Sequence, residues 1–552
     1  MKKRYLFLFV ILFSLTAVAQ QRTDNQKLDI AKAVIYGQNA NTRAYGQTLI
    51  KMLKENSVLS VVGYEKGPFV VVSNDETIEP VLGYSLTNVS TIDSINPGML
   101  WWLNSVSDVL KVKAIQKQIY TLVAPPSEYP QKCGPIITSV WNQNSPYNNQ
   151  CPLVKTGSST RYPTGCVATA ISQIMYYWKY PEHGIGEHQY SFQPADGEGR
   201  ILSANFGETM YNWSQMIDDY SKPYTNAEAD AVSTLMLHCG VAVDMGYTAD
   251  GSGAYSTEAC AGLKKYFGYN ENMRIYTRSY YSATQWMNMI YEELSNNRPV
   301  YYAGADASNG GHAFVLNGYD ENGRVLVNWG WGGKENGYYD IALLNPSSYQ
   351  FSLQQNMIIG FCKPDVDIPY KSQLASATGD LKYSFYGTTT MRASIALTAF
   401  DVADAAFSGS VAALLQNVDT KEITVVKQVD GISLNPMLGG TMQGVQISLP
   451  SINLSVIPDG TYRLFVGSKS SNDTDWQLVR TIGDNNSSYV IVKNGTDVTS
   501  EGSTDDSWTT GLSNIVISTD KANGKYYNLS GVEVNVNYKG ILIHNGKKLI
   551  NK

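Results

Sequence analysis

The sequence predicts an α+β protein of several domains: a small α+β unit, a larger mixed block of helices and strands, and a β-sandwich-like domain. Three observations support this class. The chain has 552 residues, which is too long for one hydrophobic core. Its content of 43% hydrophobic and 16% charged residues is typical of globular proteins. Its hydrophobic pattern changes from mixed periodicities to strand-like alternation after about residue 370.

The first 19 residues have the pattern of a secretory signal peptide. A basic start precedes an apolar core and the small-residue motif Ala17-Val18-Ala19. The apolar run is short for a membrane-spanning helix, and no later stretch reaches the roughly 18 apolar residues that such a helix needs. We therefore expect a protein that is secreted or held at the outer cell surface, with no transmembrane segment.

Residues 20–127 are expected to form the small α+β unit. Residues 26–38 and 97–122 have helical periodicity, and residues 57–85 alternate β-branched runs with turn residues. The Pro-rich segment 123–130 is typical of a linker or a processing site.

Two further regions follow the mixed block, which spans residues 128–365. Residues 366–496 carry alternating strand patterns separated by turn signals, which indicates an Ig-like β-sandwich. Residues 497–552 are read as a polar linker and a short β segment. This last segment loosely resembles the C-terminal segments of exported Bacteroidetes proteins, and both a sorting signal and a folded cap are consistent with it.

Charge and cysteine content narrow the function classes. The net charge of −6 and the lack of a basic run outside the N-terminus argue against nucleic-acid binding. Six cysteines are too few for a disulfide scaffold in an exported chain of this length. The spacing allows the local pairs Cys133–Cys151 and Cys239–Cys260 but does not establish either of them.

Cys166 stands at the start of an amphipathic helix. Apolar residues recur after it at helical spacing, at Val167, Ala170, Ile171, Ile174, Met175 and Trp178. In the first turn of a helix, unpaired N–H groups and the helix dipole lower the pKa of a thiol and stabilise an oxyanion beside it. The periodicity alone fits a nucleophile and a buried, inert cysteine equally well.

A thiolate nucleophile needs a base, and His312 is the best candidate among five histidines. It follows two glycines at the start of a predicted strand, and Asn328 ends the partner strand sixteen residues later. A hairpin that turns midway would bring the Asn328 amide to the imidazole, with Trp329 and Trp331 shielding the bond from water. His183 and His188 lack further ligands nearby, so we expect no metal site.

Gln143 is a candidate for a second oxyanion donor. It lies about twenty residues before Cys166 in a loop rich in Asn, Gln and Pro. A side-chain amide there could donate to a developing oxyanion. This signal is weak alone, because such loops have many uses.

Several segments resemble the streptopain/interpain family of papain-like cysteine peptidases. They are YPTGCVATAISQIMYYWKYP, GGHAFVLNGYD and VNWGWGG followed by NGYYDIALLNP. The resemblance implies a papain-like fold with Cys166 as nucleophile and His312 as base and acid. It further implies an oxyanion hole formed by Gln143 and the Cys166 amide, with Asn328, Trp329 and Trp331 orienting and covering the histidine. The segment GPFVVVSNDETIEPVLGYS resembles the inhibitory propeptide of that family.

We therefore expect a secreted cysteine endopeptidase made as a zymogen, with protein or peptide substrates and its own propeptide as intramolecular inhibitor. No metal or organic cofactor is implied. Two alternatives stay open: a cell-wall amidase or transpeptidase that uses the same dyad, and a catalytically inert surface adhesin.

Overall fold

The computed structural model describes most of the chain. The described residues are 20–37, 49–86, 91, 94–116, 120–193, 199–306, 310–344, 355–368, 372–376, 381–387, 391–401, 406–434, 444–482, 485–504, 526–528, 533–534, 540–544 and 547–551. The predicted signal peptide lies outside them, as does the predicted C-terminal linker from residue 505 on. The chain divides into two compact units, of which the first holds residues 1–273, 283–346 and 350–367.

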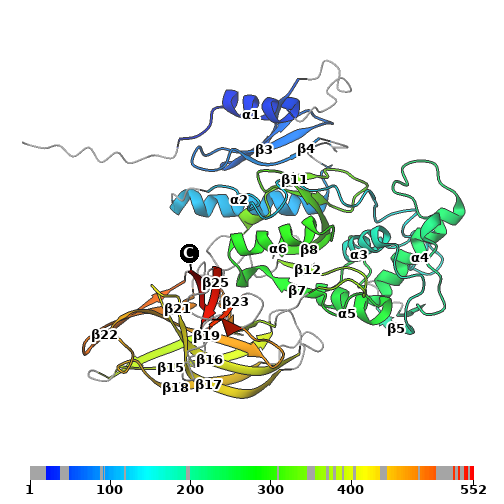
Figure 1. Ribbon diagram of the computed structural model, residues 1–552. Coiled ribbons are helices and arrows are strands. Elements are labelled where there is room, and N and C mark those ends of the chain that lie inside the picture. The colour runs from blue at the N-terminus through cyan, green and yellow to red at the C-terminus, as the bar shows by residue number, and fades with distance from the viewer. Residues whose placement is uncertain are drawn as a thin grey trace, which may run out of the picture. The chain divides into compact units, whose positions relative to one another are not determined.

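The N-terminal part of the first unit is an antiparallel sheet with two helices (Figure 1). Its elements are α1 (Asp24–Gly37), β1 (Lys51–Glu55), β2 (Leu59–Gly63), β3 (Phe69–Ser73), β4 (Val81–Ser85) and α2 (Pro97–Gln116). Ala31 and Ile35 of α1 pack on Val62, Val70 and Val72 of the sheet. Burial of this apolar face fixes α1 on the sheet, as the helical and alternating patterns predicted.

The rest of the first unit adds helices and a second set of strands. The helices are α3 (Cys166–Trp178), η3 (Trp213–Gln215), α4 (Asn226–Ala242), α5 (Ser256–Phe267), α6 (Ala283–Ser295) and η5 (Ala342–Leu344). The strands are β5 (Glu187–Phe192), β6 (Arg200–Asn205), β8 (Val300–Asp306), β9 (Gly310–Tyr319), β10 (Val325–Asn328), β11 (Gly337–Tyr339) and β12 (Asn356–Ile359). β5 and β6 pair with each other in a separate two-stranded sheet.

One continuous sheet joins the two parts of this unit. Its strands run in the order β1-β2-β3-β4-β11-β10-β9-β8-β12. The junction is the antiparallel pair β4–β11, in which Tyr84 lies opposite Tyr338 and Gly83 opposite Tyr339. The N-terminal segment therefore extends the sheet that carries His312.

The second unit is a β-sandwich. One sheet holds β13 (Leu374–Ser376), β14 (Lys382–Tyr386), β15 (Arg392–Asp401) and β18 (Val445–Asn453). The other holds β16 (Phe407–Asn417), β17 (Ile423–Leu434), β19 (Gly460–Ser470), β20 (Gln477–Leu478), β21 (Ser488–Asn494) and β22 (Asp497–Ser503). Ile395 and Leu449 of the first sheet share one hydrophobic core with Val411, Leu464 and Val466 of the second. The expected α+β class with an additional β-sandwich is confirmed.

Short elements complete the second unit. β7 (Arg274–Thr277) and η4 (Arg278–Tyr280) group with it. The terminal strands β23 (Tyr526–Asn528), β24 (Glu533–Val534), β25 (Gly540–His544) and β26 (Lys547–Asn551) form a sheet of their own.

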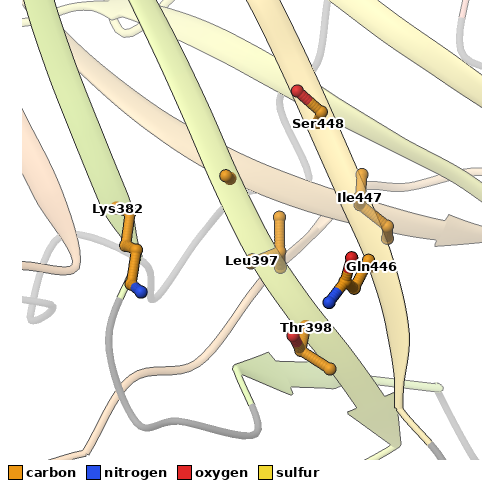
Figure 2. Close-up of a pocket in the computed structure, with 7 residues that line it drawn as sticks. Lys382, Leu397, Thr398, Gln446, Ile447 and Ser448 are labelled. Carbon is orange, nitrogen blue, oxygen red and sulfur yellow. The ribbon is translucent and has the colours of Figure 1, made fainter.

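A cavity of about 420 Å³ opens on β14, β15 and β18 (Figure 2). Lys382, Thr398, Gln446 and Ser448 line it, and they alternate along the strands with residues of the sandwich core. The cavity therefore lies on the face of the sheet that points away from the core.

Two expectations about the whole chain can be compared with the structure. No helix among the described residues is long and apolar enough to cross a membrane. All six cysteines are free thiols, so neither of the two local disulfides that spacing allows is formed.

Candidate active site

Cys166 is the first residue of α3. Gly165 precedes it with φ 87°, and a Cβ at this position would lie 2.8 Å from the carbonyl oxygen of Ser252. Glycine is therefore required there for both conformation and space. The apolar residues predicted to face inward, from Val167 to Met175, are buried and anchor the helix. This anchoring holds the thiol in the first turn, where the backbone N–H groups have no acceptor within the helix itself.

His312 lies on β9, opposite Gly304 of β8, and is 6% exposed. Its Nε2 is 2.9 Å from the carbonyl oxygen of Trp329. A carbonyl only accepts, so Nε2 carries the proton in this arrangement, and Nδ1 is left for the thiol. The imidazole also makes a side-chain hydrogen bond to Cys166. The structure thus brings the two predicted partners together.

The thiol of Cys166 has a lowered pKa. Burial alone would raise the pKa above its ordinary value of 9.0. The hydrogen bond and the charge of His312, together with hydrogen bonds from the backbone of Ala313 and Val167, outweigh this burial and lower the pKa. The environment therefore favours the nucleophilic thiolate.

Gln143 lies beside the start of α3. Its carbonyl oxygen accepts a hydrogen bond of 3.0 Å from the backbone N–H of Thr164, two residues before Cys166. Its side chain is buried, and its Nε2 has no hydrogen-bond acceptor among the described residues. A buried donor without an acceptor costs about 1–3 kcal/mol. A substrate oxyanion would supply the missing acceptor.

Asn328 does not bind the imidazole, in contrast to the expected contact. It lies opposite Val315 rather than His312, because the β9–β10 turn is centred later than midway between the two residues and β9 has a bulge at Asn317. Its Nδ2 instead donates to the carbonyl of Ser139 (2.8 Å) and to Oε1 of Gln173 (3.0 Å). The backbone carbonyl of the next residue takes the place next to His312 that was expected for Asn328.

Trp329 and Trp331 both lie close to His312. Trp329 is fully buried, and its Nε1 donates to the carbonyl of Glu335 at 3.0 Å. The Trp331 ring centroid is 6.3 Å from that of His312, at an interplanar angle of 31°. Both residues thus lie next to the imidazole, although the bond from Asn328 that they were expected to shield is not formed.

A second set of residues that contact the site, which the sequence did not indicate, belongs to α2. A Cβ at Gly98 would lie 2.3 Å from Cδ2 of His312 and 2.7 Å from Cε3 of Trp329. A Cβ at Gly304, opposite His312, would lie 2.1 Å from the ring of Trp101. The N-terminal turns of α2 therefore lie directly against the strands of the site. A glycine in the first turns of a helix, followed by two tryptophans, was the available signal.

Asn96 fixes the start of α2 against the same region. Its Oδ1 accepts the N–H of Met99 at 2.8 Å, which caps the helix. Its Nδ2 donates to Oε2 of the fully buried Glu335 at 2.7 Å. The carboxylate thereby ties the N-terminal segment to the loop that follows Trp329.

Two of the remaining histidines of the first unit, His188 and His238, have side-chain partners. Nε2 of His188 is 2.7 Å from Oδ1 of Asp244, and Nδ1 of His238 is 2.9 Å from the hydroxyl of Tyr211. Burial lowers the pKa of His238 to about 4. Within the described part of the chain, no group of three metal-ligating side chains comes together.

A thiol with a lowered pKa at a helix start, hydrogen-bonded to a histidine on a neighbouring strand, defines a papain-like cysteine peptidase. In this chain an N-terminal propeptide adds strands to the same sheet. Comparison with known proteins identifies the family. Residues 141–339 match the Peptidase C10 family, and residues 19–109 match the Spi protease inhibitor. The chain belongs to the Peptidase C10 family, whose related members are cysteine-type endopeptidases.

Streptopain from Streptococcus pyogenes is 35% identical over 309 residues, which are 53% of this chain and 76% of streptopain. The thiol protease/hemagglutinin PrtT from Porphyromonas gingivalis is 35% identical over 315 residues, 54% of this chain but only 36% of PrtT. A solved fragment of prointerpain A from Prevotella intermedia superposes with a TM-score of 0.53 and 40% identity. It covers 58% of this chain and 100% of the fragment.

Proposed function

We propose that this protein is a secreted cysteine endopeptidase made as a zymogen, in which Cys166 and His312 hydrolyse peptide bonds through an acyl-enzyme. The hydrogen bond between the two side chains, which lowers the pKa of the thiol, is the observation that carries the proposal. Together with the family membership, it favours an active peptidase over an inert adhesin. The signal-peptide pattern of residues 1–19 supports secretion.

In the acylation step, the Cys166 thiolate attacks the carbonyl carbon of the scissile bond. The backbone N–H of Cys166 and Nε2 of Gln143 donate to the oxyanion. His312 gives its Nδ1 proton to the leaving amine, the C–N bond breaks, and a thioester remains on the enzyme.

In the deacylation step, the neutral Nδ1 of His312 takes a proton from water. The resulting hydroxide attacks the thioester carbon, the C–S bond breaks, and the acid product leaves with the thiolate and imidazolium restored. The Trp329 carbonyl keeps Nε2 protonated through both steps. Nδ1 is therefore the nitrogen that gives and takes the proton in both of them.

Residues 20–127 act as the intramolecular inhibitor in this proposal. Gly98 packs on His312 and Trp101 packs on Gly304, so α2 covers the face of β8 and β9 that carries the histidine. A substrate chain cannot occupy the same space. The pairing of β4 with β11 is a second contact that binds the inhibitor to the peptidase part.

The test compares the full-length protein with its Cys166→Ala variant during incubation with a thiol reductant. Mass spectrometry follows loss of the N-terminal segment, and casein hydrolysis follows activity. Cys133→Ser is the matched control, because Cys133 is another incompletely buried free thiol. We expect the wild type and the control to mature and cleave casein, and the Cys166→Ala variant to do neither.

Casein cleavage by the Cys166→Ala variant would rule out the proposed nucleophile. If the wild type spares casein but releases peptides from cell walls in a Cys166-dependent way, the amidase alternative replaces the endopeptidase.

A further inference from the structure

Gln173 is a fully buried amide in the catalytic helix α3. It stands about two helical turns after Cys166, so the two residues lie on the same face of the helix. Its neighbours Ile174 and Met175 are buried and apolar. Burying a side-chain amide costs about 1–3 kcal/mol unless it is hydrogen-bonded, so a glutamine at this position needs partners.

The side-chain oxygen of Gln173 accepts three hydrogen bonds. The donors are Oγ of Ser139 (3.0 Å), the backbone N–H of Trp141 (3.2 Å) and Nδ2 of Asn328 (3.0 Å). The first two belong to the segment that leads to Gln143, and the third belongs to β10. Nδ2 of Asn328 also donates to the carbonyl of Ser139 at 2.8 Å. One oxygen atom of α3 therefore holds this segment and β10 together.

The segment held by Gln173 carries the expected oxyanion donor. Gln143 is two residues after Trp141, and its backbone N–H donates to Oδ1 of Asn142 at 2.7 Å. Its backbone carbonyl accepts from the N–H of Thr164, which lies just before α3. Gln143 is thus connected to α3 on one side through Trp141 and Gln173 and on the other side through Thr164. The position of its side chain relative to the thiol depends on both connections.

The segment has other partners, which fix other groups of it. The N–H of Val140 donates to the carbonyl of Asp218, and the carbonyl of Trp141 accepts from the N–H of Gly332, both at 2.9 Å. The bond to Gln173 instead fixes the N–H of Trp141 in relation to the helix that carries the nucleophile.

His312 is held by a different set of bonds. Its Nε2 contacts the carbonyl of Trp329 at 2.9 Å, and Trp329 is fixed by its own bonds to Asn336 and Glu335. A change at Gln173 should therefore disturb the oxyanion hole and leave the thiolate and imidazolium in place.

We propose that Gln173 is a positioning residue for the oxyanion hole. Through Trp141, its Oε1 sets the place of Gln143, so that Nε2 of Gln143 meets the oxyanion formed when Cys166 attacks. A donor must lie about 2.7–3.1 Å from that oxygen, and a misplacement of about 1 Å costs about 100-fold in rate. The inference rests on the proposed peptidase function, in which Gln143 supplies that donor.

The test measures kcat and KM for casein with variants of the full-length protein. Each variant is matured by resin-bound wild-type enzyme, which is then removed. Gln173→Met replaces the amide by a thioether of similar length, which accepts hydrogen bonds only weakly. Gln173→Glu keeps an oxygen in the same place, and the three donors stabilise its carboxylate. It loses no bond at the position of Nε2, which has no acceptor among the described residues.

Leu263→Ala is the matched control for a loss of stability. Leu263 lies in α5 and is 1% exposed, and it takes no part in the bonds of Gln173. Truncating a buried leucine costs about 2–5 kcal/mol in the free energy of unfolding.

We expect Gln173→Met to lower kcat about 10-fold or more and to leave KM within about twofold, because the oxyanion is present only in the transition state. Gln173→Glu and Leu263→Ala should keep kcat within about threefold of the wild type. Alkylation of Cys166 by iodoacetamide needs the thiolate but no oxyanion hole, so its pH dependence should be unchanged in Gln173→Met.

The inference is overturned if Gln173→Met has the kcat of the control, if Gln173→Glu loses as much kcat as Gln173→Met, or if the pH dependence of alkylation moves. If Gln173→Met does not fold, Ser139→Ala, which removes one of the three donors, decides in its place. A kcat several-fold below that of the control would then support the inference, and an equal kcat would overturn it. Failure of the proposed function would show differently, as a wild type that does not cleave casein, and would overturn the inference with it.

Discussion

The backbone carbonyl of Trp329 orients His312, and the Asn328 side chain binds other partners. The Trp329 carbonyl is held in place by the hydrogen bonds of Trp329 itself, whose N–H donates to Oδ1 of Asn336 and whose indole donates to Glu335. Asn328 instead joins β10 to α3 and to the segment at Ser139. Its amide therefore links the two sides of the site and does not contact the reacting groups.

Asn328→Ala should lower stability more than it changes the proton chemistry. The change leaves the buried Ser139 carbonyl and the N–H of Gly330 without their present partners. We expect a loss of about 1–3 kcal/mol in the free energy of unfolding, measured by denaturant titration. The pH profile of kcat/KM should keep its shape. A stable variant with a shifted profile would instead assign Asn328 to the orientation of the imidazole.

His312→Ala should raise the pKa of Cys166. In the native protein, the pKa is lowered although burial acts in the opposite direction. Removing the imidazole leaves the burial and takes away the hydrogen bond and the charge, so the thiolate forms only at higher pH. We expect iodoacetamide to react at least 10-fold more slowly with Cys166 at neutral pH, and the rate to rise at higher pH than in the wild type. An unchanged pH profile would contradict the assigned pair.

At the scale of elements, α3 could be predicted from the sequence and the contacts of α2 could not. The spacing of Val167, Ala170 and Ile174 predicts both the helix and its buried face. The Gly-Gly-His start of β9 indicated His312 as the base. The placement of α2 depends on the pairing of β4 with β11. Those strands are about 250 residues apart in the sequence, and no local periodicity reports such a pairing.

The register of the β9–β10 hairpin was unpredictable for a related reason. A one-residue bulge at Asn317 of β9 changes which residues lie opposite each other, and the hydrophobic alternation of the strands does not fix its position. The identities of the residues around His312 could therefore be proposed from the sequence, whereas the partner of its Nε2 could not.

Gly98→Ala should weaken the inhibitor. The added methyl group would lie 2.3 Å from Cδ2 of His312, so the first turns of α2 must move away from the site. We expect faster loss of the N-terminal segment and earlier onset of casein hydrolysis in a time course of the full-length protein. Gly37→Ala is the matched control, because a Cβ there meets no atom within 4 Å. Equal activation rates in both variants would show that the contact does not restrain the enzyme.

At the scale of the whole molecule, Asp340 links the peptidase strands to the N-terminal segment. It is fully buried, its carbonyl accepts from Nε1 of Trp102 at 3.0 Å, and its Oδ2 accepts from the hydroxyl of Tyr120 at 2.7 Å. Burial raises the pKa of Asp340 to about 6, although the bonds from Tyr120 and the backbone act in the opposite direction. The ionised carboxylate is therefore unfavourable in the folded zymogen.

The contribution of Asp340 to the stability of the zymogen should fall as pH rises from about 4 to about 6. Below this range the carboxyl is protonated in both the folded and the unfolded chain. Within it, only the unfolded chain loses the proton, which favours unfolding, and above it the penalty is constant. Asp340→Asn should remove this dependence and raise the free energy of unfolding at pH 7 by about 1–3 kcal/mol. Parallel pH–stability curves for variant and wild type would contradict the raised pKa.

The central claim, that Cys166 is the nucleophile, is tested most directly by mapping a limited iodoacetamide reaction on the mature enzyme by mass spectrometry. Burial raises the pKa of the Cys151, Cys239 and Cys362 thiols to about 12 and also raises that of Cys133, whereas the pKa of Cys166 is lowered. We predict that the label is found on Cys166 and that the labelled fraction equals the fraction of peptidase activity lost. Full activity with Cys166 alkylated, or activity lost with the label on another cysteine, would contradict the account.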